Sequence, residues 1–151
     1  MALVVDASVG LKWFLPEPDS DIAAELAESG EDLLAPDFWL NEACNVLWRQ
    51  VRRGGLDPEQ ATQGLHLLRS SIRPTPTIAL QLHEMALEIG IAAGHSPYDT
   101  LYVAFALSQG APAVVVSDAA FARAMRRHPD CRMAGLILPL SEWKSARDAR
   151  E

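Results

Sequence analysis

The sequence predicts an α/β fold, with a central, mostly parallel sheet flanked by helices on both faces. Two short apolar runs, residues 3–5 and 113–116, have the composition of buried strands, and an aspartate follows each within two residues. Between them, apolar residues recur at the three- and four-residue spacing of amphipathic helices. Strands that alternate with helices favour a parallel sheet, because parallel strands need long, usually helical, connections.

Four segments predict the strands of this sheet. Residues 3–5 and 113–116 are wholly apolar, so both strands are expected to be buried on both faces. Residues 32–35 predict a weaker strand, which Pro36 closes. Residues 136–138 predict a last strand at the edge of the sheet.

The helices are predicted from capping residues and apolar periodicity. Ser20, Asp57 and Ser96 can each cap a helix, and a proline follows the last two at the first helical position. The predicted helices and helical turns cover residues 8–15, 20–29, 37–53, 57–72, 78–89, 96–110 and 119–127.

The helix at residues 37–53 has the clearest apolar face. Leu40, Cys44, Leu47 and Val51 recur on one side of it, so we expect Cys44 to be a buried thiol. Cys44 and Cys131 lie far apart and form no Cys-x-x-Cys pair, which argues against a cysteine metal site.

Length and composition predict one compact domain, residues 1–151. With 49% hydrophobic and 22% charged residues and no repeat, the chain can bury a core and is not a disordered composition. No stretch approaches the ~20 uncharged apolar residues of a membrane span. The first apolar run stops at Asp6 and is too short for a signal peptide. We therefore expect a cytoplasmic protein with no membrane partner.

The charge distribution excludes a simple basic protein that coats RNA. The net charge is −7, and the acids are concentrated in residues 1–42, which contain ten acids and one base. The rest of the chain contains ten acids and twelve bases, so it is slightly positive. An RNA partner is still compatible with these charges, because divalent cations can bridge carboxylates to phosphate.

Four carboxylates stand out by their positions. Asp6 and Asp118 each follow an apolar strand, and α/β folds bind ligands beyond the carboxyl ends of their strands. Asp99 lies three residues after Ser96, where a capping box would equally account for it. Glu42 lies beside the predicted apolar face of its helix, where a solvated surface residue is an equally simple interpretation. Taken singly, Asp99 and Glu42 leave both interpretations open.

Four segments together resemble the PIN-domain ribonucleases, and specifically the VapC-type toxins of bacterial toxin–antitoxin pairs. They are VVDASV at 4–9 with KWFLPE at 12–17, LAP at 34–36 with EACNVL at 42–47, SPYDTLYVAFA at 96–106, and VVVSDAAF at 114–121. Each motif is loose alone, but all four occur in the family's order across nearly the whole chain. Many relatives have Thr or Ser where this chain has Val116, which leaves open whether Ser117 supplies that hydroxyl.

The resemblance implies a PIN-like three-layer fold and a metal-dependent endoribonuclease. It implies that Asp6, Glu42, Asp99 and Asp118 converge on Mg²⁺ or Mn²⁺ as the catalytic site, and that RNA is cut to leave a 5′-phosphate and a 3′-hydroxyl. The chemistry agrees, because hard cations prefer oxygen ligands and four clustered acids repel one another unless a cation neutralises them. Ser8 and Asn45 are expected to be secondary polar groups. A VapB-type antitoxin is the implied protein partner.

Two other functions share part of this sequence pattern. A phosphatase or phosphoryl-acceptor domain would need a second acid beside Asp6 or a lysine after a late strand, and no lysine lies between Lys12 and Lys144. A catalytically silent PIN scaffold that acts as a protein-interaction module is expected to have lost at least one of the four acids, and all four are present.

The sequence also contains candidate surfaces for RNA and for a second copy of the chain. Two arginine clusters can contact RNA or simply complement helix C-termini; they are Arg49, Arg52 and Arg53, and Arg123, Arg126 and Arg127. The helix at 37–53 also has more apolar residues than one face needs, namely Trp39, Val46 and Trp48. This surplus predicts a homodimer surface. The four histidines have no metal-ligand spacing and are expected at surfaces or caps.

Overall fold

A four-stranded parallel sheet lies at the centre of the computed structural model, which describes residues 2–150. The strands are β1 (Ala2–Val5), β2 (Asp32–Leu34), β3 (Ala113–Val116) and β4 (Ile137–Pro139). Their order in the sheet is β2-β1-β3-β4. Val4 of β1 is aligned with Leu34 of β2 on one side and with Val114 of β3 on the other. The prediction of an α/β fold is confirmed, and within residues 2–150 every strand pair is parallel.

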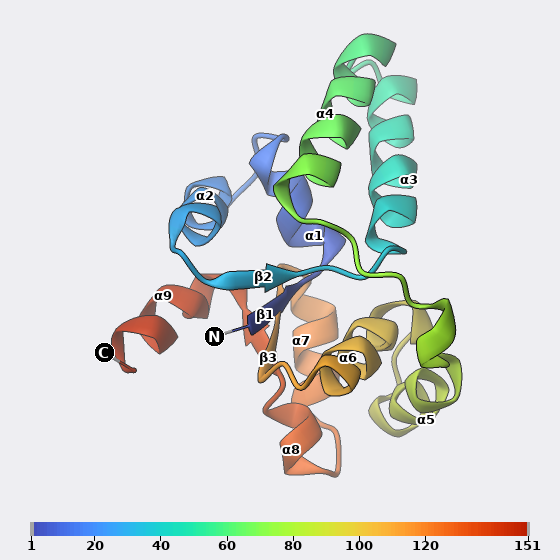
Figure 1. Ribbon diagram of the computed structural model, residues 1–151, viewed down its shortest axis with the longest axis vertical. Helices are drawn as coiled ribbons and strands as arrows, with labels where there is room; N and C mark the ends of the chain where they lie inside the picture. Colours follow the sequence, from blue (N-terminus) through green and yellow to red (C-terminus); the bar gives the residue numbers. More distant parts are fainter. Residues whose placement is uncertain (1, 151) are drawn as a thin grey trace.

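Helices cover both faces of the sheet, so the molecule has a helix–sheet–helix arrangement (Figure 1). α1 to α4 lie on one side and α5 to α8 on the other, while α9 contacts α2 and β4. The elements are α1 (Ala7–Gly10), η1 (Leu11–Trp13), α2 (Ser20–Glu28), α3 (Trp39–Arg52), α4 (Pro58–Ser71), η2 (Ile78–Leu80), α5 (His83–Ala93), α6 (Pro97–Gln109), α7 (Ala119–Arg126), α8 (Cys131–Ala134) and α9 (Leu140–Asp148). Within the described part of the chain, none of them combines the length and apolar character needed to cross a bilayer.

Helix α3 buries Leu47 as predicted, but its buried face is shifted from the predicted one. Its buried residues include Trp39 and Ala43, whereas Cys44 is exposed, so the expectation of a buried thiol is wrong. The cause is the large indole ring of Trp39, which fits over Gly10, where a Cβ would lie 2.5 Å from the ring. This rotation brings Glu42 to the border of the buried face, where it is half-buried.

The predicted helix at residues 78–89 is broken into two pieces. Gln81 adopts a left-handed backbone conformation with φ of 51°, which ends η2 and prevents a continuous helix. Ile78, at the start of η2, is 92% exposed. The buried face of α5 is made by Ile89 together with small residues, among them Ala86 and Gly90.

Two C-terminal helices were not predicted from the sequence. α8 is a single short turn, and α9 is a polar helix that buries Leu140 and Trp143 against the sheet. In the segment between α4 and η2, Thr75 forms an isolated parallel bridge with Pro36.

Gly90 sets the spacing between α5 and α6, and we expect Gly90→Ala to destabilise the protein. A Cβ at Gly90 would lie 2.8 Å from the backbone oxygen of His95, which cannot move without displacing the turn between the two helices. Overpacking of this kind costs about 1–3 kcal/mol. The higher helix propensity of alanine offsets about 1 kcal/mol of that. We therefore expect a lower melting temperature for Gly90→Ala.

Ala92→Gly changes an exposed residue of the same helix, so it measures how much the difference in helix propensity between alanine and glycine alone shifts the melting temperature. If Gly90→Ala raises the melting temperature by as much as Ala92→Gly lowers it, propensity alone operates and the packing argument is wrong.

Candidate active site

Asp6 lies at the carboxyl end of β1 and is the most buried of the four predicted site residues, at 6% exposed. Its carboxylate caps α1, accepting hydrogen bonds from the Val9 amide at 3.1 Å and the Ser8 hydroxyl at 2.6 Å. Burial raises the pKa of Asp6 to about 7 despite these bonds, and the charges of Asp99 and Asp118 add to the rise. The fold thus holds a carboxyl group where its charged form is poorly solvated.

Asp118 follows the neighbouring strand β3 and is exposed. One of its oxygens accepts hydrogen bonds from the amides of Ala120 and Phe121 at the start of α7. Because β1 and β3 are adjacent and parallel, Asp6 and Asp118 emerge at the same end of the sheet. The parallel pairing therefore places Asp6 and Asp118 at one edge of the sheet.

Ser8 connects the two strand ends. Its hydroxyl donates to Asp6 and accepts from the Ser117 amide at 3.1 Å. Val116, the position at which the chain departs from many relatives, is buried within β3 and offers no polar group. The hydroxyl found beside Asp6 is that of Ser8, one of the expected secondary groups.

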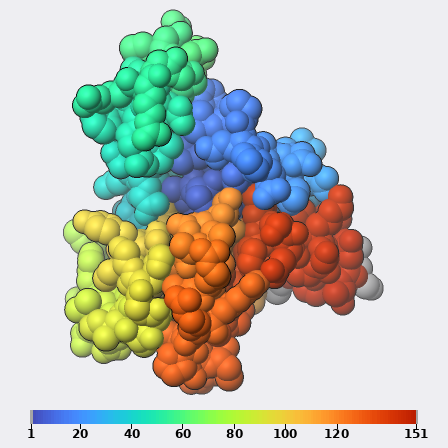
Figure 2. Space-filling view, turned by 180° about the vertical axis from the view of Figure 1, so that it is seen from behind, coloured from blue at the N-terminus to red at the C-terminus, as the bar shows by residue number. Residues whose placement is uncertain are grey.

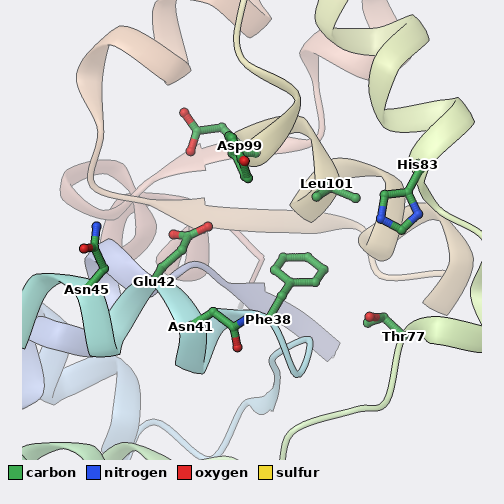
Figure 3. A pocket seen from close by; sticks show the side chains of 9 residues that line it. Phe38, Asn41, Glu42, Asn45, Thr77, His83, Asp99 and Leu101 are labelled. Atoms are coloured by element: carbon green, nitrogen blue, oxygen red, sulfur yellow. The ribbon is translucent and has the colours of Figure 1, made fainter.

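Glu42 of α3 and Asp99 of α6 come from opposite sides of the sheet and face the same opening (Figure 3). Both are half-buried. Burial, followed by the charges of Asp6 and Asp99, raises the pKa of Glu42 to about 7. Glu42 is therefore not a fully solvated surface residue, which was one of the two interpretations that its sequence position left open.

The environment of Asp99 differs from that of a capping residue. Ser96 caps α6 by accepting from the Tyr98 amide at 3.3 Å, and the Asp99 carboxylate bonds His95 Nε2 at 2.7 Å. His95 was expected to be an ordinary surface or cap residue, so this contact was missed. Its only signal in the sequence is the four-residue spacing to Asp99, and that spacing does not show which neighbour a histidine will bond.

Tyr102, one turn after Asp99, is a second group that sequence reasoning missed. The side chain is buried and packs edge-on against Phe38, with ring centroids 5.0 Å apart. Its buried hydroxyl has no partner at standard hydrogen-bond geometry among residues 2–150, yet it lies near enough to Glu42 to favour the charged form of that carboxyl. Burial raises the pKa of Tyr102 well above its usual value, and the nearby charges of Glu42 and Asp6 contribute.

The four acids form one electrostatically linked group. Asp6 senses the charges of Asp99 and Asp118, and Glu42 senses those of Asp6 and Asp99. Over the described residues, no three carboxylate, imidazole or thiol groups already stand close enough together to enclose a metal ion. The donor chemistry fits Mg²⁺ or Mn²⁺, because the group offers carboxylate oxygens and a cation would relieve the repulsion that contributes to the raised pKa values of Asp6 and Glu42. Mg²⁺ usually binds through one or two carboxylates while keeping water.

Comparison with known proteins places this arrangement in a family. A model described as the PIN domain matches residues 3–126. The chain belongs to the PIN-domain family. It is 31% identical over 112 residues to Ribonuclease VapC3 of Pyrobaculum aerophilum, an alignment that covers 70% of this chain and 82% of that protein.

The crystal structure of PAE2754 from Pyrobaculum aerophilum has the same fold as this PIN domain. The two superpose with a TM-score of 0.69 at 21% sequence identity, over 99% of this chain and 90% of the other. The predicted resemblance to the PIN domains, including a VapC-type relative, is thus confirmed, as is the three-layer fold.

A cavity of about 510 Å³ opens in the PIN domain directly beside Glu42 and Asp99. Phe38 and Leu101 give it an apolar wall, and Asn41 and Asn45 of α3 line it as polar groups. Seen from behind, the surface is notched between α3, in teal, and α6, in yellow (Figure 2). The volume falls within the range of small-ligand sites in proteins.

The two arginine clusters of the PIN domain differ in the contacts of their side chains. The Arg52 guanidinium lies over the Trp48 ring at 5.3 Å from its centroid, and both stay exposed at the end of α3. Arg126 of α7 is paired with Glu142 of α9 at 2.7 Å. RNA contact by either cluster remains a prediction.

Proposed function

We propose that this PIN domain is a metal-dependent endoribonuclease, the toxin of a VapBC-type toxin–antitoxin pair. The observation that supports this most is the group of four carboxylates. Asp6, Glu42, Asp99 and Asp118 come from β1, α3, α6 and the end of β3, and their charges are coupled at one end of the sheet. The 31% identity to Ribonuclease VapC3 supports the substrate class.

In this proposal the four carboxylates hold Mg²⁺ or Mn²⁺. The bound cation supplies Lewis-acid chemistry, lowering the pKa of an attacking water and neutralising charge that develops at the phosphate. The chain contributes the geometry. Hydrogen bonds from Ser8 and Val9 fix the orientation of Asp6, and the first two amides after Ala119 fix that of Asp118. In the metal-free protein Asp6 and Glu42, whose pKa values are both raised to about 7, are the two groups of the four that can exchange a proton near neutral pH.

The cavity beside Glu42 and Asp99 is the proposed approach for single-stranded RNA. Tyr98 stands at its rim with 78% of its surface exposed, where an aromatic ring can stack on a nucleobase. The end of α3 adds three exposed arginines whose guanidinium groups suit phosphate contacts, namely Arg49, Arg52 and Arg53. Tyr98 thus adds an affinity for unpaired bases to the electrostatic attraction of the arginines.

A catalytically silent PIN scaffold that binds other proteins is the alternative. It is favoured only by the exposed apolar side chains, such as Trp48 and Ile91, which suit a protein partner. These side chains are equally expected of a toxin that binds an antitoxin, so they do not weigh against the enzyme.

A cleavage assay on a mixture of transfer and ribosomal RNA tests the proposal. We expect cuts with 5′-phosphate ends in Mg²⁺ or Mn²⁺, none in EDTA, and recovery when the cation is restored. The product of the neighbouring reading frame, added in equimolar amount, is expected to suppress cleavage, since a basic antitoxin segment can pair with the carboxylates. RNA that stays intact under all metal conditions would favour the silent scaffold, and cleavage unaffected by the neighbour would remove the toxin assignment.

We further propose that the protein is a cytoplasmic homodimer. Trp39 cannot belong to the dimer surface predicted from α3, because it is fully buried in the core. Trp48 remains available at 54% exposed, and Leu87 and Ile91 add apolar surface on α5. Light scattering at micromolar concentration measures the mass directly.

A further inference from the structure

His95 occupies the turn between α5 and α6 and touches two of the helices that present the site. Its Nε2 bonds Asp99 Oδ2 at 2.7 Å, and only 18% of its side chain is exposed. The imidazole also stacks on Phe121 of α7, with ring centroids 5.1 Å apart and planes 20° from parallel. The Phe121 amide in turn donates to Asp118 at 3.1 Å.

The backbone around His95 leaves the ring little freedom. Gly94 takes a left-handed conformation with φ of 64°, and the His95 amide then donates to the Gly90 oxygen at 3.0 Å. Phe121, the ring beneath the imidazole, is fully buried. Backbone and stacking together therefore determine where Nε2 points.

We propose that His95 is a positioning residue for Asp99. By donating from Nε2 to Oδ2, it prevents rotation of the carboxylate and leaves Oδ1 to face the shared opening with Glu42. This proposal rests on the proposed function, because it states how the four-acid group gains affinity for Mg²⁺ or Mn²⁺. Carboxylates that bind metals are commonly held by such hydrogen bonds, and losing the partner typically costs about 10–100-fold in metal affinity.

A matched pair of variants isolates the hydrogen bond from the stacking. His95→Gln and His95→Met have side chains of similar length, both lack the ring, and only glutamine can donate an N–H to Asp99. Mn²⁺ affinity of the metal-free protein is measured by electron paramagnetic resonance, together with its melting temperature. We expect His95→Met to bind Mn²⁺ about 10–100-fold more weakly than the wild type. His95→Gln is expected to recover most of that loss, at a melting temperature similar to that of His95→Met.

Two further variants complete the test. His95→Phe keeps an aromatic ring over Phe121 and is expected to bind Mn²⁺ as weakly as His95→Met. His66→Phe, an exposed histidine on α4, is the control and should leave the Mn²⁺ affinity unchanged. If His95→Gln, His95→Met and His95→Phe all bind Mn²⁺ within twofold of the wild type, the positioning role is excluded while the nuclease proposal stands. A wild-type protein that binds no Mn²⁺ would overturn both.

Discussion

Asp99→Asn is expected to give a folded protein whose metal-dependent RNA cleavage falls at least about a thousandfold, the scale seen when one member of a cooperating catalytic group is removed. Asparagine keeps the shape of the side chain and can still accept the hydrogen bond from His95 Nε2. The cap of α6 is the Ser96 hydroxyl, so the helix keeps its N-terminal bond. A loss of stability above about 1 kcal/mol is therefore not expected.

The control for Asp99→Asn is Asp57→Asn, the same exchange at the start of α4. Asp57 caps that helix through the Gln60 amide and is exposed, away from the four acids. Both variants should fold, and only Asp99→Asn should lose cleavage and toxicity. The double variant Asp6→Asn with Asp99→Asn should be little worse than either single variant, because members of one catalytic unit are not additive. A folded Asp99→Asn protein that cuts RNA near the wild-type rate would remove Asp99 from the site.

Asp6→Asn is expected to stabilise the metal-free protein, and to do so more at pH 8 than at pH 5. The folded protein raises the pKa of Asp6 to about 7, so folding takes up a proton between the usual pKa of an aspartate and about pH 7. The folded state therefore loses stability as the pH rises through that window, by at most about 1.4 kcal/mol per pH unit for this one group. Asparagine has no charge to bury, so its advantage is only partial at pH 5 and reaches its full size above pH 7.

Urea unfolding in EDTA at pH 5 and pH 8 measures this difference. The raised pKa of Glu42 acts in the same direction, so part of the pH dependence should persist in Asp6→Asn. Adding Mn²⁺ at pH 8 should stabilise the wild type and leave Asp6→Asn largely unaffected, since a ligand stabilises only the state that binds it. Asp57→Asn provides the baseline for an exposed aspartate. An advantage of Asp6→Asn that is equal at both pH values would contradict the buried-charge explanation.

The central sheet, with Asp6 and Asp118 after two of its strands, could be predicted because its signals are local. An uninterrupted apolar run such as residues 113–116 has few alternatives to a buried strand, and the aspartate after it marks the edge where ligands bind. Asp99 and Glu42 needed more than local signals, because a capping residue and a solvated acid have the same sequence pattern. Their assignment came from four motifs in a fixed order.

Tertiary packing explains what the sequence could not predict. Cys44 and Ala43 both have plausible periodicity on α3, and only the fit of Trp39 over Gly10 decides which faces inward. Helix α9 is mostly polar, and it is stable because Leu140 and Trp143 are buried against the sheet. The contacts of His95 and Tyr102 with the acids depend on side-chain directions across three helices, which no spacing along the chain specifies.

The pairing of β1 with both β2 and β3 has a consequence for the order of events during synthesis of the chain. The β1–β2 pair joins segments about 30 residues apart, so it can form while translation is still in progress. The other edge of β1 stays unpaired until β3 has left the ribosome, and Asp118 follows β3 directly. A nascent chain that ends before β3 contains Asp6, Glu42 and Asp99, but it lacks the strand that brings Asp118 beside them. The proposed nuclease is thus assembled only after Asp118 has left the ribosome, so a ribosome is not exposed to an active enzyme while the segments before Asp118 are being made.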